Sequence, residues 1–123
     1  MLQYITVFIG GGSGSMLRFL LSQLNTGESA GLPIGTILAN VLSCIVLGFT
    51  ITLLEQKGAN PPLKALIAVG FCGGFSTFST FSLESFQLLR TQPLYGFLNI
   101  GLSLVLCLFA IYLGMQTYRI LEN

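Results

Sequence analysis

GFCGGFSTFSTFSLESF, residues 70–86, interrupts the third of four apolar stretches in this chain. Two adjacent glycines, Gly73 and Gly74, are followed by serine and threonine hydroxyls that alternate with phenylalanines, and then by the carboxylate of Glu84. Polar groups at membrane depth are costly unless protein encloses them, and there they mark the path of a substrate or an ion. This stretch is therefore where we expect the function of the protein to lie.

The composition of the chain is that of an integral membrane protein. Of its 123 residues, 53% are hydrophobic and only 7% are charged, and the mean hydropathy is +0.84. A spanning helix needs about 20 mostly apolar residues, and the sequence supplies four such stretches, at residues 2–24, 32–54, 62–89 and 94–118. We expect an all-α membrane protein with a single domain, residues 1–123, made of four transmembrane helices, of which the third is broken at Gly73-Gly74.

Several other classes of protein are disfavoured by the same sequence. The first stretch does not read as a secretory signal, because no basic residue precedes its apolar run, which contains a glycine cluster and Arg18. Cys44, Cys72 and Cys107 lie in apolar stretches without CxxC spacing, so we expect them to be packing residues. The net charge of +1, with no cluster of lysine and arginine, argues against nucleic-acid binding. The chain contains no histidine and no cofactor loop, so we do not expect an enzyme.

Short connections near residues 25–31, 55–61 and 91–93 predict antiparallel neighbours, with both chain ends on one side of the membrane. Lysine and arginine set the orientation of membrane proteins. Three such residues on the side of the termini oppose two on the other side: Lys57, Lys64 and Arg119 against Arg18 and Arg90. This weak bias predicts insertion in both orientations and an antiparallel dimer, and insertion in one orientation is the alternative. Four helices also enclose little volume, so a transport path needs an oligomer.

Polar side chains repeat along the second and fourth spans. Thr36, Asn40 and Ser43 share one face of a helix. A stripe on the fourth span repeats every four residues, and its members are Tyr95, Asn99, Ser103 and Cys107. A buried amide without partners costs about 1–3 kcal/mol, so Asn40 either bonds to a neighbouring helix or meets a permeant ion. Both interpretations stay open for Asn40 and for the fourth-span stripe, whose uncharged donors suit a small anion.

The interruption of the third span offers two kinds of binding group. Gly73-Gly74 invites a local loss of helix, and the freed backbone carbonyls then form a ready site for a cation. Phe75, Phe78 and Phe81 are spaced by three residues, which is typical of packing. The edge of an aromatic ring is nevertheless electropositive, so a ring turned inward can also meet a small anion.

Two ionisable side chains accompany these groups. We expect Arg18, near the end of the first span, to extend to the lipid headgroups rather than to bind a substrate. Glu84 follows Phe81 by about one helical turn. Three interpretations of Glu84 stay open: a vestibule residue, a partner of Arg90 or a side chain at the membrane interface.

Three motifs, in this order, resemble the CrcB/Fluc family of small fluoride channels over essentially the whole chain. GGSGSMLRF, residues 11–19, resembles the family's glycine-rich opening that ends in arginine. GTILAN, residues 35–40, resembles its Gly-Thr-x-x-x-Asn segment, and GGFSTFSTFS, residues 73–82, resembles its Gly-Gly-x-Thr-Thr-Phe-Ser-Thr-Phe signature. The resemblance implies an antiparallel, dual-topology homodimer in the bacterial cytoplasmic (inner) membrane, with two pores that let fluoride leave the cytoplasm passively.

The resemblance also implies roles for individual residues. It implies a structural sodium ion at the dimer interface, held by the backbone carbonyls of Gly73 and Ser76 from each subunit. The residues that it places in the pore, or that share a face or a track with them, are Asn40, Phe78, Phe81, Ser79, Thr80, Ser103 and Thr36. Asn99 and Cys107 depart from the family's fourth-span track, where tyrosine or serine is usual, and Arg18, Glu84 and Asn99 are candidates for vestibule or structural roles.

Fluoride suits this set of residues. The ion is small, strongly hydrated and only accepts hydrogen bonds, so its pore needs many donors and no fixed cation in the narrow part. One alternative is a proton-coupled small multidrug exporter, which needs a carboxylate in the centre of the first span, and residues 2–24 contain none. The other alternative is a membrane assembly subunit that conducts no ion.

Overall fold

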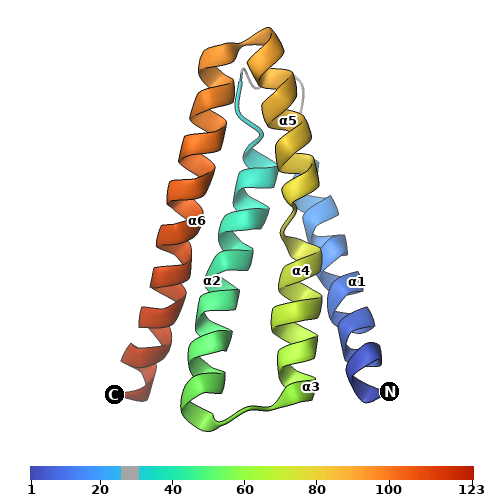
Figure 1. The fold of residues 1–123 in the computed structure, drawn as a ribbon, viewed down its shortest axis with the longest axis vertical. Coiled ribbons are helices and arrows are strands. Elements are labelled where there is room, and N and C mark those ends of the chain that lie inside the picture. Colours follow the sequence, from blue (N-terminus) through green and yellow to red (C-terminus); the bar gives the residue numbers. More distant parts are fainter. Residues whose placement is uncertain (26–30) are drawn as a thin grey trace.

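The computed structural model describes residues 1–25 and 31–123, and this part of the chain is almost entirely helical (Figure 1). In chain order the helices are α1 (Leu2–Ser22), α2 (Ile34–Lys57), α3 (Pro61–Lys64), the π-helix η1 (Ala65–Phe71), α4 (Cys72–Phe75), α5 (Phe78–Thr91) and α6 (Pro93–Glu122). The segments α3 to α5 together form the third span, so the chain has four stretches long and apolar enough to cross a membrane. The predicted all-α, four-span fold is confirmed, and most of the predicted connection at 25–31 lies outside the described residues.

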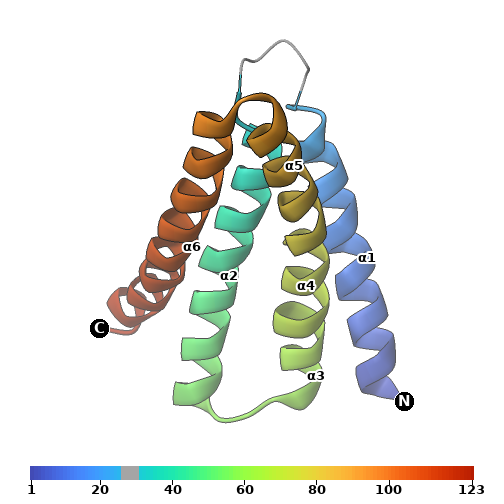
Figure 2. The ribbon, with the colours of Figure 1, turned by 45° about the horizontal axis from the view of Figure 1, so that its top comes forward.

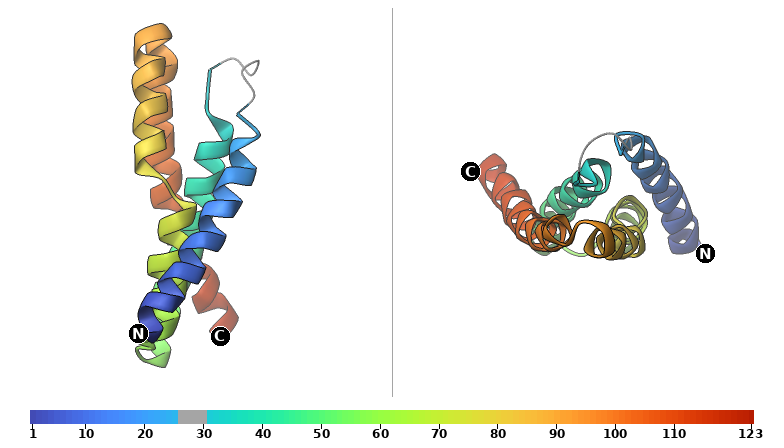
Figure 3. Two further views of the ribbon diagram at one scale, coloured as in Figure 1. Left: turned by 90° about the vertical axis from the view of Figure 1, so that its right-hand side faces the viewer. Right: turned by 90° about the horizontal axis from the view of Figure 1, so that it is seen from above.

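Both chain ends and the α2–α3 connection lie at one end of the bundle, and the α5–α6 turn lies at the other (Figures 1 and 2). α1 packs mainly against η1 and α4, whereas α6 packs against α2 and α5. Seen from above, the helices fan out rather than close into a ring (Figure 3). Because α2 contacts both groups of helices, it is the most buried of the four spans.

Turn residues reverse the chain between the spans. α2 ends at Lys57 because Gly58 takes a φ of +92°, which favours glycine. Asn60 then caps α3, since its Oδ1 accepts a hydrogen bond from the Leu63 amide at 3.1 Å, and the first two residues of α3 are prolines. Pro93 begins α6 in the same way. These local signals explain why α2 and the third span, and the third span and α6, run antiparallel to each other.

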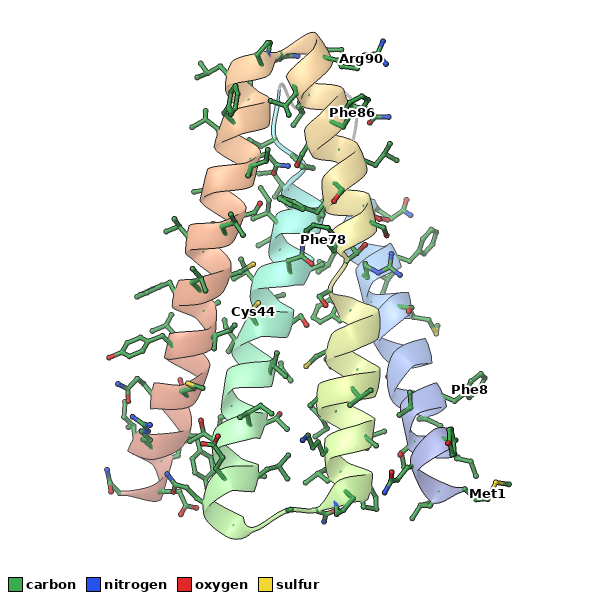
Figure 4. All side chains as sticks on the ribbon, viewed as in Figure 1. Met1, Phe8, Cys44, Phe78, Phe86 and Arg90 are labelled. Carbon is green, nitrogen blue, oxygen red and sulfur yellow. The ribbon has the colours of Figure 1, made fainter. Side chains whose placement is uncertain are left out.

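Large apolar side chains cover the outside of the bundle. Met1, Phe8 and Phe86 point away from it (Figure 4), with exposed fractions of 94%, 81% and 59%. The buried residues include many small and polar ones: Thr36, Ser43, Thr50, Thr52, Ser85, Asn99 and Ser103. This pattern is the reverse of that in a water-soluble protein, and it is typical of helices that are surrounded by lipid and joined by small residues and hydrogen bonds.

Two glycines let α2 and α6 approach closely. A Cβ atom on Gly48 would collide with the backbone carbonyl of Ile111, and one on Gly114 would collide with the backbone carbonyl of Ile45. Each helix therefore contributes one glycine to the contact, and the two backbones come closer than larger residues allow.

We expect Gly114→Val to destabilise the fold, because its side chain would meet backbone atoms of α2, and overpacking of this kind costs about 1–3 kcal/mol or more. Thermal unfolding of the purified protein in detergent measures the loss. Gly101→Ala is the control on the same helix, since a Cβ atom there meets nothing within 4 Å. Equal melting temperatures for the two variants would contradict this account of the helix contact.

The third span is interrupted as predicted, but at Ser76 and Thr77 rather than at Gly73-Gly74. Ser76 has a ψ of 157°, and Thr77 is extended, with φ −149° and ψ 118°. Gly73 and Gly74 instead lie within α4. The reason is packing, because a Cβ atom on Gly74 would collide with the backbone carbonyl of Gly11 on α1. Gly74 therefore allows α4 to pack closely against α1, and the extended residues come after the two glycines.

Candidate functional site

Asn40 of α2 holds the extended backbone at the interruption. Its Oδ1 accepts a hydrogen bond from the Thr77 amide at 2.8 Å, and its Nδ2 donates to the Thr77 carbonyl at 3.3 Å. One side chain thus satisfies both backbone groups of Thr77 where no helix can do so. An amide nitrogen carries two N–H donors, so Asn40 can join two helices and still donate to another acceptor.

Thr77 also begins α5 and changes the bonding of the residues before it. Its Oγ1 accepts a hydrogen bond from the Thr80 amide at 3.2 Å, as an N-cap does. In a continuous helix the amides of Thr77 and Thr80 would pair with the carbonyls of Gly73 and Ser76. Because both amides donate to side chains instead, the interruption frees these two carbonyls from their helical partners.

A cavity of about 210 Å³, which we call the aromatic cavity, lies between α2, the interruption, α5 and α6. Its lining residues are Asn40, Cys44, Ser76, Thr77, Phe78, Phe81, Ser103, Leu104 and Cys107. The ring centroids of Phe78 and Phe81 are 5.8 Å apart, with their planes tilted by 43°, and Figure 4 shows Phe78 at the start of α5. The cavity brings together Asn40, Phe78, Phe81 and Ser103, and no charged side chain is among the lining residues that the structure describes.

A second cavity, of about 350 Å³, shares Thr77 with the first and is here called the hydroxyl cavity. Its lining residues are Ser15, Arg18, Phe19, Ser22, Thr36, Thr77 and Thr80. Thr36 and Thr80, both predicted as pore residues, thus lie here rather than beside the phenylalanines. Thr77 stands between a hydroxyl-rich cavity with a cation in its wall and an uncharged cavity lined by aromatic rings.

Arg18 lines the hydroxyl cavity and binds the third span. Its Nε donates a hydrogen bond to the Gly74 carbonyl at 3.0 Å. In a continuous helix this carbonyl would accept from Phe78, which lies beyond the interruption and is the first residue of α5. The expected extension of Arg18 to the headgroups is therefore not what the structure shows, because the interruption provides a carbonyl acceptor closer by.

Glu84 is tied to the start of α2. Thr36 Oγ1 donates to Glu84 Oε1 at 2.9 Å, and Asn25 Nδ2 donates to the same oxygen at 3.3 Å. The Gly35 amide donates to Asn25 Oδ1 at 2.6 Å, which completes the cluster. Glu84 Oε2 is buried without a hydrogen-bond partner in the described part of the chain. The carboxylate is thus held by Thr36, which lines the hydroxyl cavity, but Glu84 is not itself among the lining residues.

Two further polar predictions concern Arg90 on α5 and Asn99 on α6. The Arg90 guanidinium lies 5.9 Å from the centre of the Phe86 ring, so the suggested partnership of Arg90 with Glu84 is not observed. Asn99 is fully buried; its Nδ2 donates to Ser85 Oγ at 2.9 Å and its Oδ1 accepts from Ser103 at 3.4 Å. Asn99 therefore joins α6 to α5 and lines neither cavity.

Sequence patterns did not reveal two residues of the site, and the predicted residue Ser79, like Asn99, lies apart from it. Thr77 could have been found as a helix cap. It directly precedes Phe78, the first residue of α5, and threonine is a favoured residue at this position. Asn25 had been assigned to a connection, and no sequence signal pointed to its contact with Glu84. Ser79 lies outside both cavities, with its exposed hydroxyl 3.4 Å from Thr77 Oγ1.

Fold and site together define a small multi-pass membrane protein whose third span is interrupted beside two cavities, as in channels and transporters. The family described as "CrcB-like protein, Camphor Resistance (CrcB)" matches residues 5–115. The chain belongs to this family, which confirms the resemblance drawn from the three motifs.

Relatives of the chain share one functional name. This chain is 40% identical over 114 residues to the Fluoride-specific ion channel FluC of Phocaeicola vulgatus, and the alignment covers 90% of this chain and 93% of the relative. It is 40% identical over 114 residues to the protein of the same name from Shewanella loihica, with coverage of 91% and 92%. It is 40% identical over 115 residues to the Fluoride-specific ion channel FluC 1 of Yersinia pseudotuberculosis, with coverage of 89% and 91%. The chain is accordingly a multi-pass protein of the bacterial inner membrane and not an enzyme.

Proposed function

We propose that this chain forms a fluoride-selective channel through which fluoride leaves the cytoplasm passively. The observation that carries the proposal is the meeting of two unlike cavities at Thr77. One has the Arg18 cation in its wall, and the other is uncharged and lined by Phe78 and Phe81. The relatives align with about nine-tenths of the chain, and their names support fluoride as the ion.

The two cavities suit successive steps in the passage of a small anion. In the hydroxyl cavity, Arg18 attracts anions and the hydroxyls of Thr77 and Thr80 replace part of their water. In the aromatic cavity, the remaining N–H of Asn40 and the positive ring edges take over this role. No fixed cation lines this second part, so the ion binds there weakly enough to leave.

We place two such paths in an antiparallel homodimer. The open fan of helices supports a second copy, because one chain alone does not close around its site (Figure 3). Gly12 supports it too, since a Cβ atom on it meets nothing within 4 Å in the single chain, and small residues are typical of helix contacts in membranes. The nearly balanced lysine and arginine residues are compatible with insertion in both orientations.

We assign a structural sodium ion to the interface of this dimer. The donor set fits the ion: the Gly73 and Ser76 carbonyls lack their usual helical amides, and carbonyls at interrupted membrane helices coordinate Na⁺. Gly73 is exposed, and a Cβ atom at this position would meet nothing within 4 Å, so a second copy can approach it. Two carbonyls from each copy would give four oxygen ligands, and the ion would offset the repulsion between their dipoles.

Removal of Na⁺ is expected to destabilise the dimer. If Na⁺ is present at 100 times its dissociation constant, binding contributes about 2.7 kcal/mol. Replacing it with N-methylglucamine in the buffer should therefore lower the melting temperature of the detergent-solubilised dimer. Thermal unfolding at a series of Na⁺ concentrations tests this, with constant ionic strength as the control. A melting temperature that is independent of Na⁺ would argue against the site.

Fluoride efflux from liposomes that contain the purified chain tests the channel itself. A fluoride electrode should record efflux down the gradient, and a chloride electrode should record none above protein-free liposomes. Flux that needs a proton gradient and carries lipophilic cations would indicate a multidrug exporter. Liposomes that stay tight to fluoride would overturn the proposal and favour an assembly subunit.

A further inference from the structure

Two cysteine thiols lie together in the wall of the aromatic cavity. Cys44 comes from α2 and Cys107 from α6, and both line the cavity beside Phe78 and Phe81. Gly48 of α2 meets Ile111 of α6, and on these two parallel helices each cysteine lies one turn before its contact residue, so Cys44 and Cys107 lie at the same level of the α2–α6 contact. Both side chains are half-buried, and Figure 4 shows Cys44 in the middle of α2. The pair is thus accessible from the cavity and held in place by a close contact between two helices.

The chemistry of this pair does not suit fluoride. A thiol is a weak hydrogen-bond donor, so the pair adds little to the replacement of water around a hard anion. Thiolates are instead soft ligands, which select soft metal ions such as Cu(I). Cys72 is only 3% exposed and does not line the cavity. In the described ranges, 1–25 and 31–123, no three cysteine or carboxylate side chains come together to hold a metal. The site therefore offers two sulfur ligands.

We propose that Cys44 and Cys107 bind a soft, thiophilic cation that accepts two ligands, such as Cu(I), Ag(I) or Hg(II), and that this cation closes the fluoride path. Two S–H bonds break, two sulfur–metal bonds form, and the two protons leave through the cavity to the solvent, with no change in oxidation state. The bound ion fills part of the 210 Å³ cavity and puts a cation beside the phenylalanine rings, where an attracted fluoride ion is held rather than passed. The closure rests on the proposed channel function, whereas the metal site does not.

Binding is tested without any flux. Hg²⁺ is titrated as its nitrate into the purified protein in chloride-free detergent buffer, and mass spectrometry and thiol titration follow the product. We expect one Hg²⁺ per chain, with two thiols lost for each ion. Cys44→Ser and Cys107→Ser should each lower the affinity by more than the roughly 100-fold that loss of an outer-shell partner costs. Cys72→Ser should retain the site. Binding of one Hg²⁺ at each cysteine independently, or unchanged affinity in both variants, would overturn the assignment.

Two further measurements sharpen this experiment. Zn²⁺ should bind much more weakly than Hg²⁺, because zinc takes four ligands in structural sites and the pair supplies two. Cys44→Ala and Cys107→Ala replace either serine variant that fails to elute as a single species in gel filtration. Zn²⁺ bound as tightly as Hg²⁺ would contradict a two-ligand site for soft cations.

Closure is tested by fluoride efflux from liposomes, each variant being compared with its own flux in the absence of metal. Low concentrations of Hg²⁺ should slow fluoride efflux through the parent protein by about tenfold or more, a change of about 1.4 kcal/mol in the barrier. Dithiothreitol should restore the efflux. Cys44→Ser and Cys107→Ser should lose this sensitivity, and Cys72→Ser should keep it. Undiminished flux with one Hg²⁺ bound per chain would overturn the closure. Absence of fluoride flux before metal is added would instead overturn the proposed channel function.

Discussion

Phe81→Ile should slow fluoride efflux by roughly a hundredfold, which corresponds to about 2.7 kcal/mol of lost stabilisation at the barrier. Isoleucine keeps an apolar side chain in the wall of the aromatic cavity but removes the electropositive ring edge, which is the group able to meet an anion there. Phe78→Ile should have a similar effect, because the two rings lie 5.8 Å apart and line the same cavity. Efflux from liposomes, normalised to the amount of reconstituted dimer, measures both effects.

Phe97→Ile is the matched control for these two variants. Phe97 lies on α6, is 69% exposed and lines neither cavity, so the same chemical change there should leave the flux within about twofold. Gel filtration and thermal unfolding separate loss of conduction from loss of fold. Undiminished efflux in the Phe81 and Phe78 variants, or an equal loss in the Phe97 variant, would remove the rings from the path.

The interruption of the third span shows what a sequence reveals about such a site and what it does not. Four apolar stretches and short turns predicted the spans, because length and hydropathy are properties of the chain itself. The glycine pair correctly indicated an interrupted span but gave the wrong position. Glycine permits both an unwound backbone and a close helix contact, and only the packing of Gly74 against Gly11 decides which of them occurs.

Polar side chains were harder to interpret because their roles depend on partners far away in the chain. Asn40 and Asn99 look alike in sequence, since each lies in a polar stripe with a spacing of about four residues. Asn40 meets the extended backbone of Thr77 and borders a cavity, whereas Asn99 is fully buried between Ser85 and Ser103. Helical periodicity gives the face of a residue but not its neighbour. The partners of Arg18 and Glu84 could not be predicted from the sequence for the same reason.

The cysteine pair follows from three-dimensional contact as well. Cys44 and Cys107 are 63 positions apart in the sequence, and without CxxC spacing each one reads as a packing residue. The α2–α6 contact brings both to the wall of one cavity, and the glycines Gly48 and Gly114 make that contact close. A site built from two spans is thus invisible to any motif that lies within one span.

Asn40→Asp should abolish measurable fluoride efflux, a loss of at least about a hundredfold or 2.7 kcal/mol. The substitution keeps the oxygen that accepts the Thr77 amide at 2.8 Å, but it replaces the N–H donor that faces the Thr77 carbonyl with a second oxygen. A carboxylate there repels the carbonyl and any anion in the aromatic cavity, and low dielectric strengthens both effects. Liposome efflux, with gel filtration to establish that the dimer is intact, measures the result.

Two comparisons separate the charge of this variant from its effect on structure. Asn123→Asp makes the same change at the exposed C-terminus and should conduct like the parent protein. Asn40→Ala removes both hydrogen bonds to Thr77 without adding charge, so it should lower the melting temperature more than Asn40→Asp, which keeps one of them. If Asn40→Asp conducts normally while Asn40→Ala does not, then Asn40 acts only by holding Thr77, and the fluoride ion does not pass within reach of its side chain.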